Sequence, residues 1–340
     1  MVAVVATLGI CVGCGSGSSH TLYAASPVTN QVAAYRTTSG GALSLVGSAA
    51  ATGTSPDAAA IAPSHKFLYV ANFLSNSISV FALGSDGSIG STVATVSTGI
   101  QPISLLLTPD GSHLYSIDQG ARTISVFSVD TSAGTLTAVS GSPVNLGFVP
   151  TAAVMDPSGT YMYISAAGYV YLYVIQTDGI PAPVAAYYAA YSPTSMAIDP
   201  NGLYLYVTDT INNTVAAFAI SSGALTPVIG SPFAVGQHPV SVSLDGPGTH
   251  VLVVNEQSNN VSVLTMDTST GAMTAVTGSP FAAGTQPVFG TLNSSAGSFY
   301  VSNQGSGSIS EFKYDSSSGN LTSVGQTTAA GGAPGALATY

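Results

Sequence analysis

The sequence contains few charged residues and no tryptophan. Four of its 340 residues are basic and fourteen are acidic, which gives a formal net charge of −10. Binding to nucleic acid or to an anionic membrane surface needs clustered Lys and Arg, so we expect neither partner. The absence of Trp excludes the Trp-Asp signature of WD-type repeats.

Cysteine occurs only at the extreme N-terminus, as Cys11 and Cys14. The apolar stretch 2–13 is too short to span a bilayer as a helix and is typical of a secretion signal. The following segment, Val12-Gly13-Cys14-Gly15-Ser16-Gly17-Ser18-Ser19, resembles a bacterial lipoprotein signal, which implies lipidation of Cys14. We therefore expect residues 1–19 to be a signal and Gly/Ser tether, residues 20–340 to form one domain, and the protein to be extracytoplasmic and membrane-anchored.

The leader also admits other interpretations. Met1 is followed directly by Val2, without the basic segment that usually opens a signal. A start further upstream, or an uncleaved leader with two idle cysteines, would account for this departure. A redox role for Cys11 and Cys14 lacks the strand and helix context of such motifs.

Common signatures of cofactor and metal sites are missing from the rest of the chain. The histidines are scattered, and no Asp-rich calcium loop appears. No Gly-rich phosphate loop joins a strand to a helix, and helical periodicity is absent throughout. A Gly-x-Ser-x-Gly nucleophile between strand and helix is also missing. We predict no cofactor and no metal.

A regular repeat dominates the sequence. Seven prolines stand 43 to 48 residues apart, at positions Pro56, Pro102, Pro150, Pro193, Pro239, Pro287 and Pro334. An apolar run follows each of the first six, and then usually a turn such as Pro109-Asp110-Gly111. A Leu-Tyr-Val-like strand, a second alternating strand, a Gly-rich turn and a last strand complete the unit, as in residues 67–97. Four short strands in each period indicate an all-β, seven-bladed β-propeller of four-stranded antiparallel blades.

The two ends of the chain complete one blade. Residues 21–24 align with the second strand of the unit, and residues 334–340 align with the first strand. The C-terminal strand should therefore pair in the N-terminal blade and close the ring, which removes two exposed sheet edges. We call this blade 1, and blades 2 to 7 begin at the first six prolines.

Strand direction assigns the loops to two faces. Because the strands are antiparallel, the loops that enter each blade share a face with the turns between its second and third strands. We call this the top face. It should carry Gln101, Gln237, His238, Gln286, Asn72, Asp118, Gln119, Arg122, Asp209, Glu256 and Gln304. Most acids of the opposite face lie in Asp-Gly turns, where Asp is favoured without any function.

The Leu-Tyr-Val-x-Asn strands and the Gly-Ser-Pro segments at 141–143, 230–232 and 278–280 resemble those of lactonase-like propellers of the 6-phosphogluconolactonase family and the related Tyr-Val-Thr-Asn repeat proteins. The resemblance covers roughly residues 20–340. Family enzymes place Pro-Arg-His on an inner strand and Asn-Glu at the end of the next strand. Asn255-Glu256 matches, whereas Pro239-Val240-Ser241 lacks the Arg and the His. Asp118-Gln119-Gly120 echoes a family Asp-Leu-Gly segment, and Pro102-Ile103-Ser104 again lacks the histidine.

Opening a lactone needs a group that activates water and a group that holds the developing oxyanion. Glu256, His238 and Arg122 are the catalytic candidates, and Glu256 can equally be a solvated loop carboxylate. We expect the ligand-binding residues on the same face to be Asp118, Gln119, Asp209, Asn255 and Gln286. Blade 4 adds tyrosines, including Tyr169, Tyr171 and Tyr173, which either fill the space between blades or form a platform for sugars or a partner protein.

The sequence therefore predicts an extracytoplasmic, lipid-anchored binding or interaction module with a degenerate lactonase-type site. Its ligand would be a small molecule, glycan or protein on the top face, and we expect a monomer. The alternative is a 6-phosphogluconolactonase-like lactonase that uses Glu256, His238 and Arg122. Convergence of these side chains with Asp118 in one pocket would favour the enzyme.

Overall fold

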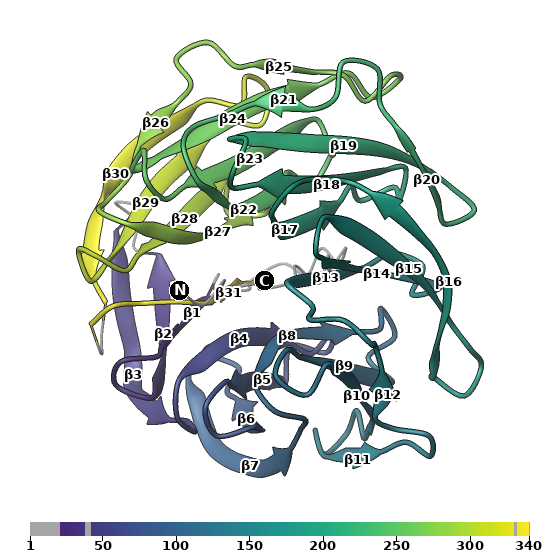
Figure 1. Ribbon diagram of the computed structural model, residues 1–340. Helices are drawn as coiled ribbons and strands as arrows, with labels where there is room; N and C mark the ends of the chain where they lie inside the picture. Colours follow the sequence, from purple (N-terminus) through teal and green to yellow (C-terminus); the bar gives the residue numbers. More distant parts are fainter. Residues whose placement is uncertain (1–20, 38–41, 330–331, 340) are drawn as a thin grey trace.

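The computed structural model describes residues 21–37, 42–329 and 332–339. Within these ranges all the regular secondary structure is β-strand, and the strands form seven sheets that surround a common centre (Figure 1). The predicted seven-bladed propeller is confirmed. The leader with Cys11, Cys14 and the Gly/Ser stretch lies outside the described residues, so the expected signal, lipidation and tether remain predictions.

Each blade contributes one inner strand next to the centre and a second strand beside it. The inner strands are β31 (Leu337–Thr339), β4 (Pro56–Ile61), β8 (Pro102–Leu107), β13 (Ala152–Met155), β17 (Pro193–Ile198), β22 (Pro239–Leu244) and β27 (Pro287–Asn293). The second strands are β1 (Thr21–Ser26), β5 (Phe67–Asn72), β9 (His113–Asp118), β14 (Tyr161–Ala166), β18 (Tyr204–Asp209), β23 (His250–Asn255) and β28 (Ser298–Asn303).

A third strand and an outer strand complete each blade. The third strands are β2 (Gln31–Thr37), β6 (Ser77–Leu83), β10 (Thr123–Val129), β15 (Tyr169–Ile175), β19 (Thr214–Ser221), β24 (Asn260–Met266) and β29 (Ser308–Tyr314). The unbroken outer strands are β3 (Leu43–Ala51), β7 (Ile89–Ser97), β16 (Pro181–Tyr188) and β30 (Leu321–Thr328). Blades 3, 5 and 6 instead have two short pieces each, β11 (Leu136–Ala138) with β12 (Val144–Asn145), β20 (Ala224–Pro227) with β21 (Phe233–Ala234), and β25 (Met273–Ala275) with β26 (Phe281–Ala282).

The Gly-Ser-Pro segments interrupt these three outer strands. Each serine hydroxyl oxygen accepts a hydrogen bond from a backbone N–H of the third strand, at 2.9 Å in all three blades. The serines are Ser142, Ser231 and Ser279, and each precedes a cis proline. The side chain thus supplies an acceptor where the backbone leaves the ladder.

The ring closes as the ends of the sequence predict. Strand β31 pairs antiparallel with β1, with Leu22 opposite Thr339 and Ala24 opposite Leu337. The N–H of Gly335 also donates to the carbonyl of Ala25 at 2.8 Å. Leu337 is buried in a cluster that joins blades 7 and 1. Closure therefore pairs the edge of β1 and buries apolar surface between the first and last blades.

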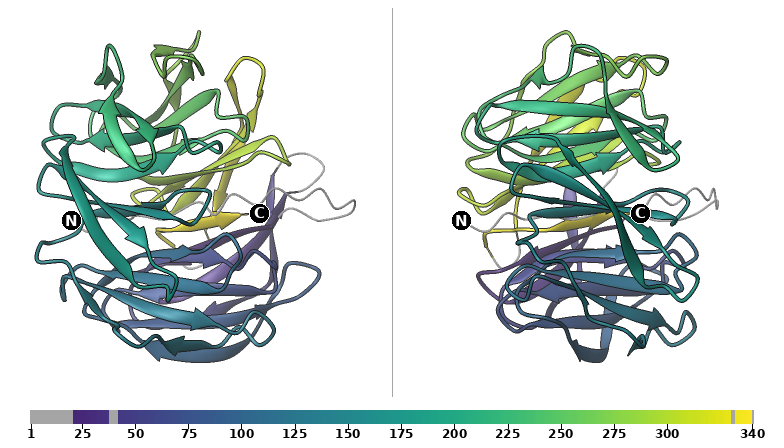
Figure 2. Two further views of the ribbon diagram at one scale, coloured as in Figure 1. Left: turned by 90° about the vertical axis from the view of Figure 1, so that its right-hand side faces the viewer. Right: turned by 45° about the vertical axis from the view of Figure 1, so that its right-hand side comes forward.

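Both faces of a blade are buried against its neighbours, which explains the nearly continuous apolar runs of the second strands. In β5, Leu68 and Val70 pack in a cluster with blade 1, whereas Tyr69 and Ala71 pack in a cluster with blade 3. The strands run across the thickness of the ring, and the loops project at its two faces (Figure 2). The candidate residues of the top face therefore stand on a rigid, repeated framework.

Tyrosine hydroxyls connect neighbouring blades on the opposite face. They belong to the second strands, and each donates to a glycine carbonyl in the third-to-outer-strand turn of the next blade. The pairs are Tyr23 with Gly87 at 3.0 Å, Tyr69 with Gly134 at 3.3 Å, Tyr115 with Gly179 at 2.9 Å, and Tyr163 with Gly223 at 2.9 Å. These bonds give buried phenols a partner and hold the blades in register.

Candidate functional site

His238 lies in the loop that enters blade 6, directly before Pro239. Its backbone is fixed on both sides, because its N–H donates to Oδ1 of Asn213 at 2.8 Å and its carbonyl accepts from the N–H of Glu256 at 2.9 Å. Its φ angle is +55°, a left-handed conformation that non-glycine residues adopt only at some energetic cost. The framework holds this residue in one conformation at the top face.

The same backbone arrangement recurs at three other entry loops. Ser55, Gln101 and Gln286 also have positive φ and receive an Asn cap from the preceding blade, at 2.7 or 2.8 Å. The capping residues are Asn30, Asn76 and Asn259. The conformation is thus a property of the repeat, and only the imidazole is particular to blade 6.

The structure brings His238 and Glu256 together. Nδ1 of His238 lies 2.7 Å from Oε2 of Glu256, and their side chains are 23% and 16% exposed. The Nδ1 atom is enclosed, and its contact with the carboxylate is close but is not aligned as a hydrogen bond. Nε2 makes no hydrogen bond to any residue in the described part of the chain. The arrangement can orient an imidazole whose second nitrogen is available for proton transfer.

Asp118 is held in the interior rather than presented on the surface. Its carboxylate accepts hydrogen bonds from the hydroxyls of Ser116, Ser125 and Thr123 and from the N–H of Gly99. Burial nevertheless raises its pKa to about 6. The carboxylate therefore connects the end of β9 to the loop that enters blade 3.

Asp209 and Asn255 occupy the same position in blades 5 and 6. Asp209 accepts from the backbone N–H groups of Tyr191 and Ser192, among others. Burial opposes its ionisation, but these hydrogen bonds outweigh burial and lower its pKa. Nδ2 of Asn255 donates to Asn260 and Ser262 at 2.8 and 2.9 Å. Both side chains are buried, and their hydrogen bonds anchor loops beneath the top face.

The remaining candidates are dispersed. Gln119 donates through Nε2 to the carbonyl of Pro150 at 3.0 Å, which ties blade 3 to blade 4. Gln286 is exposed and holds in blade 7 the position that His238 holds in blade 6. Arg122 is exposed in the β9–β10 turn of blade 3, across the ring from blade 6 (Figure 1). Within the described ranges, no ion pair or hydrogen bond joins Arg122 to Glu256 or His238.

One buried acidic residue, Asp57, is not among the site residues predicted from the sequence. Asp57 follows Pro56 at the top end of β4, where the pairing with β5 is bulged, and it is 3% exposed. Its Oδ2 has no hydrogen-bond partner among the described residues, and burial raises its pKa to about 7. The sequence does mark this position, because Asp57 follows its repeat proline whereas an uncharged residue follows each of the other six. A carboxyl group that titrates near neutrality can transfer protons, but Asp57 makes no described contact with His238.

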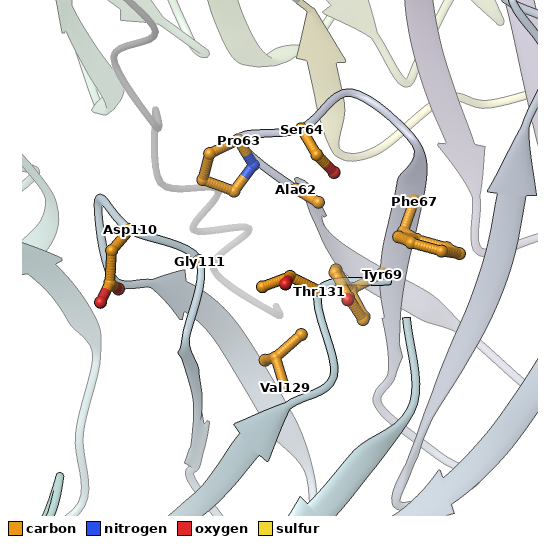
Figure 3. Close-up of a pocket in the computed structure, with 9 residues that line it drawn as sticks. All are labelled: Ala62, Pro63, Ser64, Phe67, Tyr69, Asp110, Gly111, Val129 and Thr131. Carbon is orange, nitrogen blue, oxygen red and sulfur yellow. The ribbon is translucent and has the colours of Figure 1, made fainter. Parts of the chain in front are cut away.

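Two surface cavities lie away from these residues. One, of about 110 Å³, opens on the opposite face between blades 2 and 3, and its lining includes Pro63, Tyr69 and Asp110 (Figure 3). Another, of about 580 Å³, lies at the outer rim between blades 6 and 7 and includes Thr277 and Asn320. The first is too small for a sugar ring in a typical ligand site. The lining of the second holds no acidic or basic side chain. The chemistry of the side chains therefore makes the His238–Glu256 pair the candidate site.

The described residues contain no group of three or more His, Cys, Asp or Glu side chains that could hold a metal ion. Within the same residues there is no helix with the length and hydropathy needed to cross a membrane.

Comparison with known protein families gives a match for this chain. A family model for "Lactonase, 7-bladed beta-propeller" matches residues 16–289. No curated protein matches the chain.

Solved structures show the same fold. A Bacteroides uniformis protein provisionally assigned as a 6-phosphogluconolactonase superimposes with a TM-score of 0.83 at 15% identity, covering 95% of this chain and 100% of that one. The periplasmic gluconolactonase of Pseudomonas aeruginosa gives a TM-score of 0.77 at 18% identity, with coverages of 95% and 99%. A Lactobacillus plantarum protein gives 0.79 at 16% identity, with coverages of 95% and 99%.

Proposed function

Because this chain belongs to the lactonase family of seven-bladed β-propellers, we propose that it hydrolyses a sugar lactone at its top face, with His238 as general base and Glu256 as its partner. The observation that carries the proposal is the 2.7 Å approach of His238 Nδ1 to Glu256 Oε2. Of the catalytic and ligand-binding candidates, only these two side chains come into direct contact with each other. The side chains of Asp118, Asp209 and Asn255 instead form hydrogen bonds that hold neighbouring loops in place.

The proposed reaction follows from this geometry. The carboxylate of Glu256 beside Nδ1 favours a proton on that nitrogen, so that Nε2 is free to accept a proton from water as the water oxygen attacks the lactone carbonyl. A tetrahedral oxyanion forms and collapses, and the ring C–O bond breaks. The Nε2–H then protonates the departing alkoxide oxygen, which gives a hydroxy acid and restores neutral His238. The carboxylate of Glu256 stabilises the imidazolium formed between these two steps.

The charge distribution favours an unphosphorylated substrate. A phosphate dianion is normally held by Arg or Lys. Of the four basic residues, Lys66 and Lys313 lie toward the opposite face, and Arg36 donates there to the carbonyl of Asp86. Arg122 alone lies on the top face, across the ring from His238. We therefore favour a neutral sugar lactone, as in the name of the Pseudomonas aeruginosa relative, over a 6-phosphogluconolactone.

The repeat supplies a matched variant for the test. Gln occupies the position of His238 in blades 3 and 7, so His238→Gln should keep the loop intact while removing the base. Hydrolysis of glucono-δ-lactone, 6-phosphogluconolactone and dihydrocoumarin would be followed by acid release at constant pH. We expect kcat/KM for glucono-δ-lactone to fall by roughly 10²- to 10⁴-fold in His238→Gln and also to fall in Glu256→Gln. Equal activity of wild type and His238→Gln would refute the assignment.

A binding module remains the second candidate. It is favoured by the uncharged Val240 and Ser241 that follow Pro239, and by the internal hydrogen bonds of Asp118, Asp209 and Asn255. A wild-type protein that binds lactones or sugars, but hydrolyses none of the three lactones above the buffer rate, would support this candidate.

The location of the protein is a separate proposal. The apolar leader and the Cys14 context support a lipid-anchored, extracytoplasmic protein. Incorporation of labelled palmitate into wild type, and its loss in Cys14→Ser, would support the anchor. Equal labelling of both proteins would exclude Cys14 as the attachment point.

A further inference from the structure

The exposed aromatic side chains gather at one place on the surface. Among the Tyr and Phe residues of the described ranges, only Tyr169, Tyr188 and Tyr191 are exposed, at 42%, 58% and 70%. Tyr169 begins β15, Tyr188 ends β16, and Tyr191 lies in the link to blade 5. All three therefore lie at the top side of blade 4. The other aromatic rings are buried or partly buried.

These rings belong to a continuous row. Tyr191 and Tyr188 meet edge to face with centroids 6.4 Å apart, and Tyr188 meets Tyr169 in the same way at 5.8 Å. Tyr169 lies 6.3 Å from Tyr171, which stacks on Phe148 at 3.9 Å. We call Phe148, Tyr171, Tyr169, Tyr188 and Tyr191 the aromatic row. Its inner end, Phe148 and Tyr171, is partly buried and packs against the core, and its exposed end leaves ring surface open to solvent.

The backbone holds the exposed end in place. Tyr169 and Tyr188 are directly paired across β15 and β16. The N–H groups of Ala189 and Ala190 donate to the carbonyl of Gly168, at 2.9 and 3.3 Å. The N–H of Tyr191 donates to Oδ2 of Asp209 at 2.8 Å. A ligand that binds here would find the main chain already ordered, which reduces the entropic cost of association.

Blade 4 itself carries no charged side chain at the top face, and the nearest basic residue on that face is Arg122 of blade 3. Between Pro150 and Pro193 the charged residues are Asp156 and Asp178, and both lie in turns of the opposite face. Asp209 lies beneath Tyr191, but it is 3% exposed and its oxygens accept hydrogen bonds from surrounding N–H groups. What remains is aromatic ring surface edged by phenolic hydroxyls. This chemistry suits a neutral sugar, whose C–H face packs on an aromatic ring and whose hydroxyls form hydrogen bonds at its edge.

The extent of the row argues against a protein partner. Taking roughly 200 Å² for a whole tyrosine, the three exposed fractions correspond to on the order of 350 Å². A stable protein interface buries about 800 Å² on each partner. The exposed ring surface falls well short of that area, so it suits a small ligand such as an oligosaccharide better than a second copy of this chain.

We propose that the aromatic row is a binding platform for a neutral oligosaccharide. Binding here requires neither His238 nor Glu256, so the proposal does not depend on lactone hydrolysis. The platform lies on the same face as that pair, and blade 5 separates it from blade 6 along the ring. It would hold the protein on a polysaccharide independently of any reaction.

Isothermal titration calorimetry tests the platform with four neutral hexasaccharides, namely cellohexaose, xylohexaose, mannohexaose and maltohexaose. We expect at least one to bind wild type, and the double variant Tyr188→Ala/Tyr191→Ala to bind it about tenfold more weakly or not at all. Tyr188→Phe/Tyr191→Phe keeps the rings and should bind within a few-fold of wild type. Ile229→Ala, at an exposed residue of blade 5, is the control for surface truncation and should leave binding unchanged.

Three outcomes would overturn the proposal. The first is that none of the hexasaccharides binds wild type at millimolar concentration. The second is that the double alanine variant binds as well as wild type does. The third is a wild-type dimer in sedimentation velocity that the double alanine variant loses, which would assign the row to self-association. Should the double variant melt early, Tyr191→Ala alone decides, because that side chain is 70% exposed.

Discussion

Tyr314 of blade 7 reaches back into blade 6, where its hydroxyl donates to Oδ2 of Asp245 at 2.9 Å. The same carboxylate oxygen lies 3.1 Å from Nδ1 of His250. In blades 1 to 4 the interblade bond starts from a tyrosine of the second strand, but blade 6 has Leu252 at that position. The contact between blades 6 and 7 is therefore made in the reverse direction, by a tyrosine of the later blade.

We expect Tyr314→Phe to lower the free energy of unfolding by about 1–3 kcal/mol, because it removes one donor from a buried carboxylate. The measurement is urea unfolding at neutral pH. Tyr163→Phe serves as the comparison, since its hydroxyl donates to an uncharged carbonyl and its loss should cost less. A Tyr314→Phe variant as stable as wild type would show that the interblade bond contributes nothing.

Asp57→Asn should stabilise the protein in a pH-dependent way. The folded protein holds this carboxyl at a pKa of about 7, against 3.8 for an ordinary Asp. Between these two pH values the folded state therefore binds more protons than the unfolded state. The free energy of unfolding of wild type then decreases as the pH rises from 4 to 7, because the unfolded state loses the Asp57 proton more easily. Relative to wild type, we expect Asp57→Asn to be nearly neutral at pH 4 and stabilising by up to about 4 kcal/mol at pH 8.

Differential scanning calorimetry of wild type and Asp57→Asn between pH 4 and pH 8 measures this effect. Asp178→Asn, at an exposed turn of blade 4, is the control. A difference in Tm between Asp57→Asn and wild type that stays constant over this range would contradict the prediction.

Removal of residues 335–340 should open the ring. The truncation deletes β31, exposes the edge of β1 and uncovers the cluster that Leu337 helps to fill. We expect a large fall in Tm and an increased tendency to aggregate through the exposed edge. Leu337→Ala, which keeps the strand but removes the buried side chain, should show a loss of about 2–5 kcal/mol. Melting of the truncated chain at the wild-type temperature would disprove closure by β31.

Gly99→Ala should disturb the anchor made by Asp118. A Cβ atom at residue 99 would lie 2.6 Å from Oδ2 of Asp118, whose side chain is buried and has little room to move. We expect a loss of stability larger than the loss in Gly325→Ala, where nothing lies within 4 Å of the added atom. Thermal melting of the two variants side by side provides the comparison, and equal melting temperatures would show that the loop can yield without cost.

The sequence by itself determined the repeat and much that follows from it. Alternating apolar residues between turns specify strands locally, and a period of 43 to 48 residues specifies seven such units. The offset between the ends of the chain specified that β31 pairs with β1. The antiparallel order of strands then assigned the loop that holds His238 and the turn that holds Glu256 to one face.

Packing between blades decided the rest. Asp118, Asp209 and Asn255 appear in the sequence as polar residues at strand ends, but only the neighbouring loops make them buried anchors. Asp57 is a charged residue at the start of an inner strand, and only the assembled ring buries its carboxyl group. The contact of His238 with Glu256 and the exposure of Tyr188 and Tyr191 likewise depend on where rings and loops meet in space. The repeat fixes backbone positions because it is local and periodic, whereas burial and side-chain contact are properties of the assembled ring.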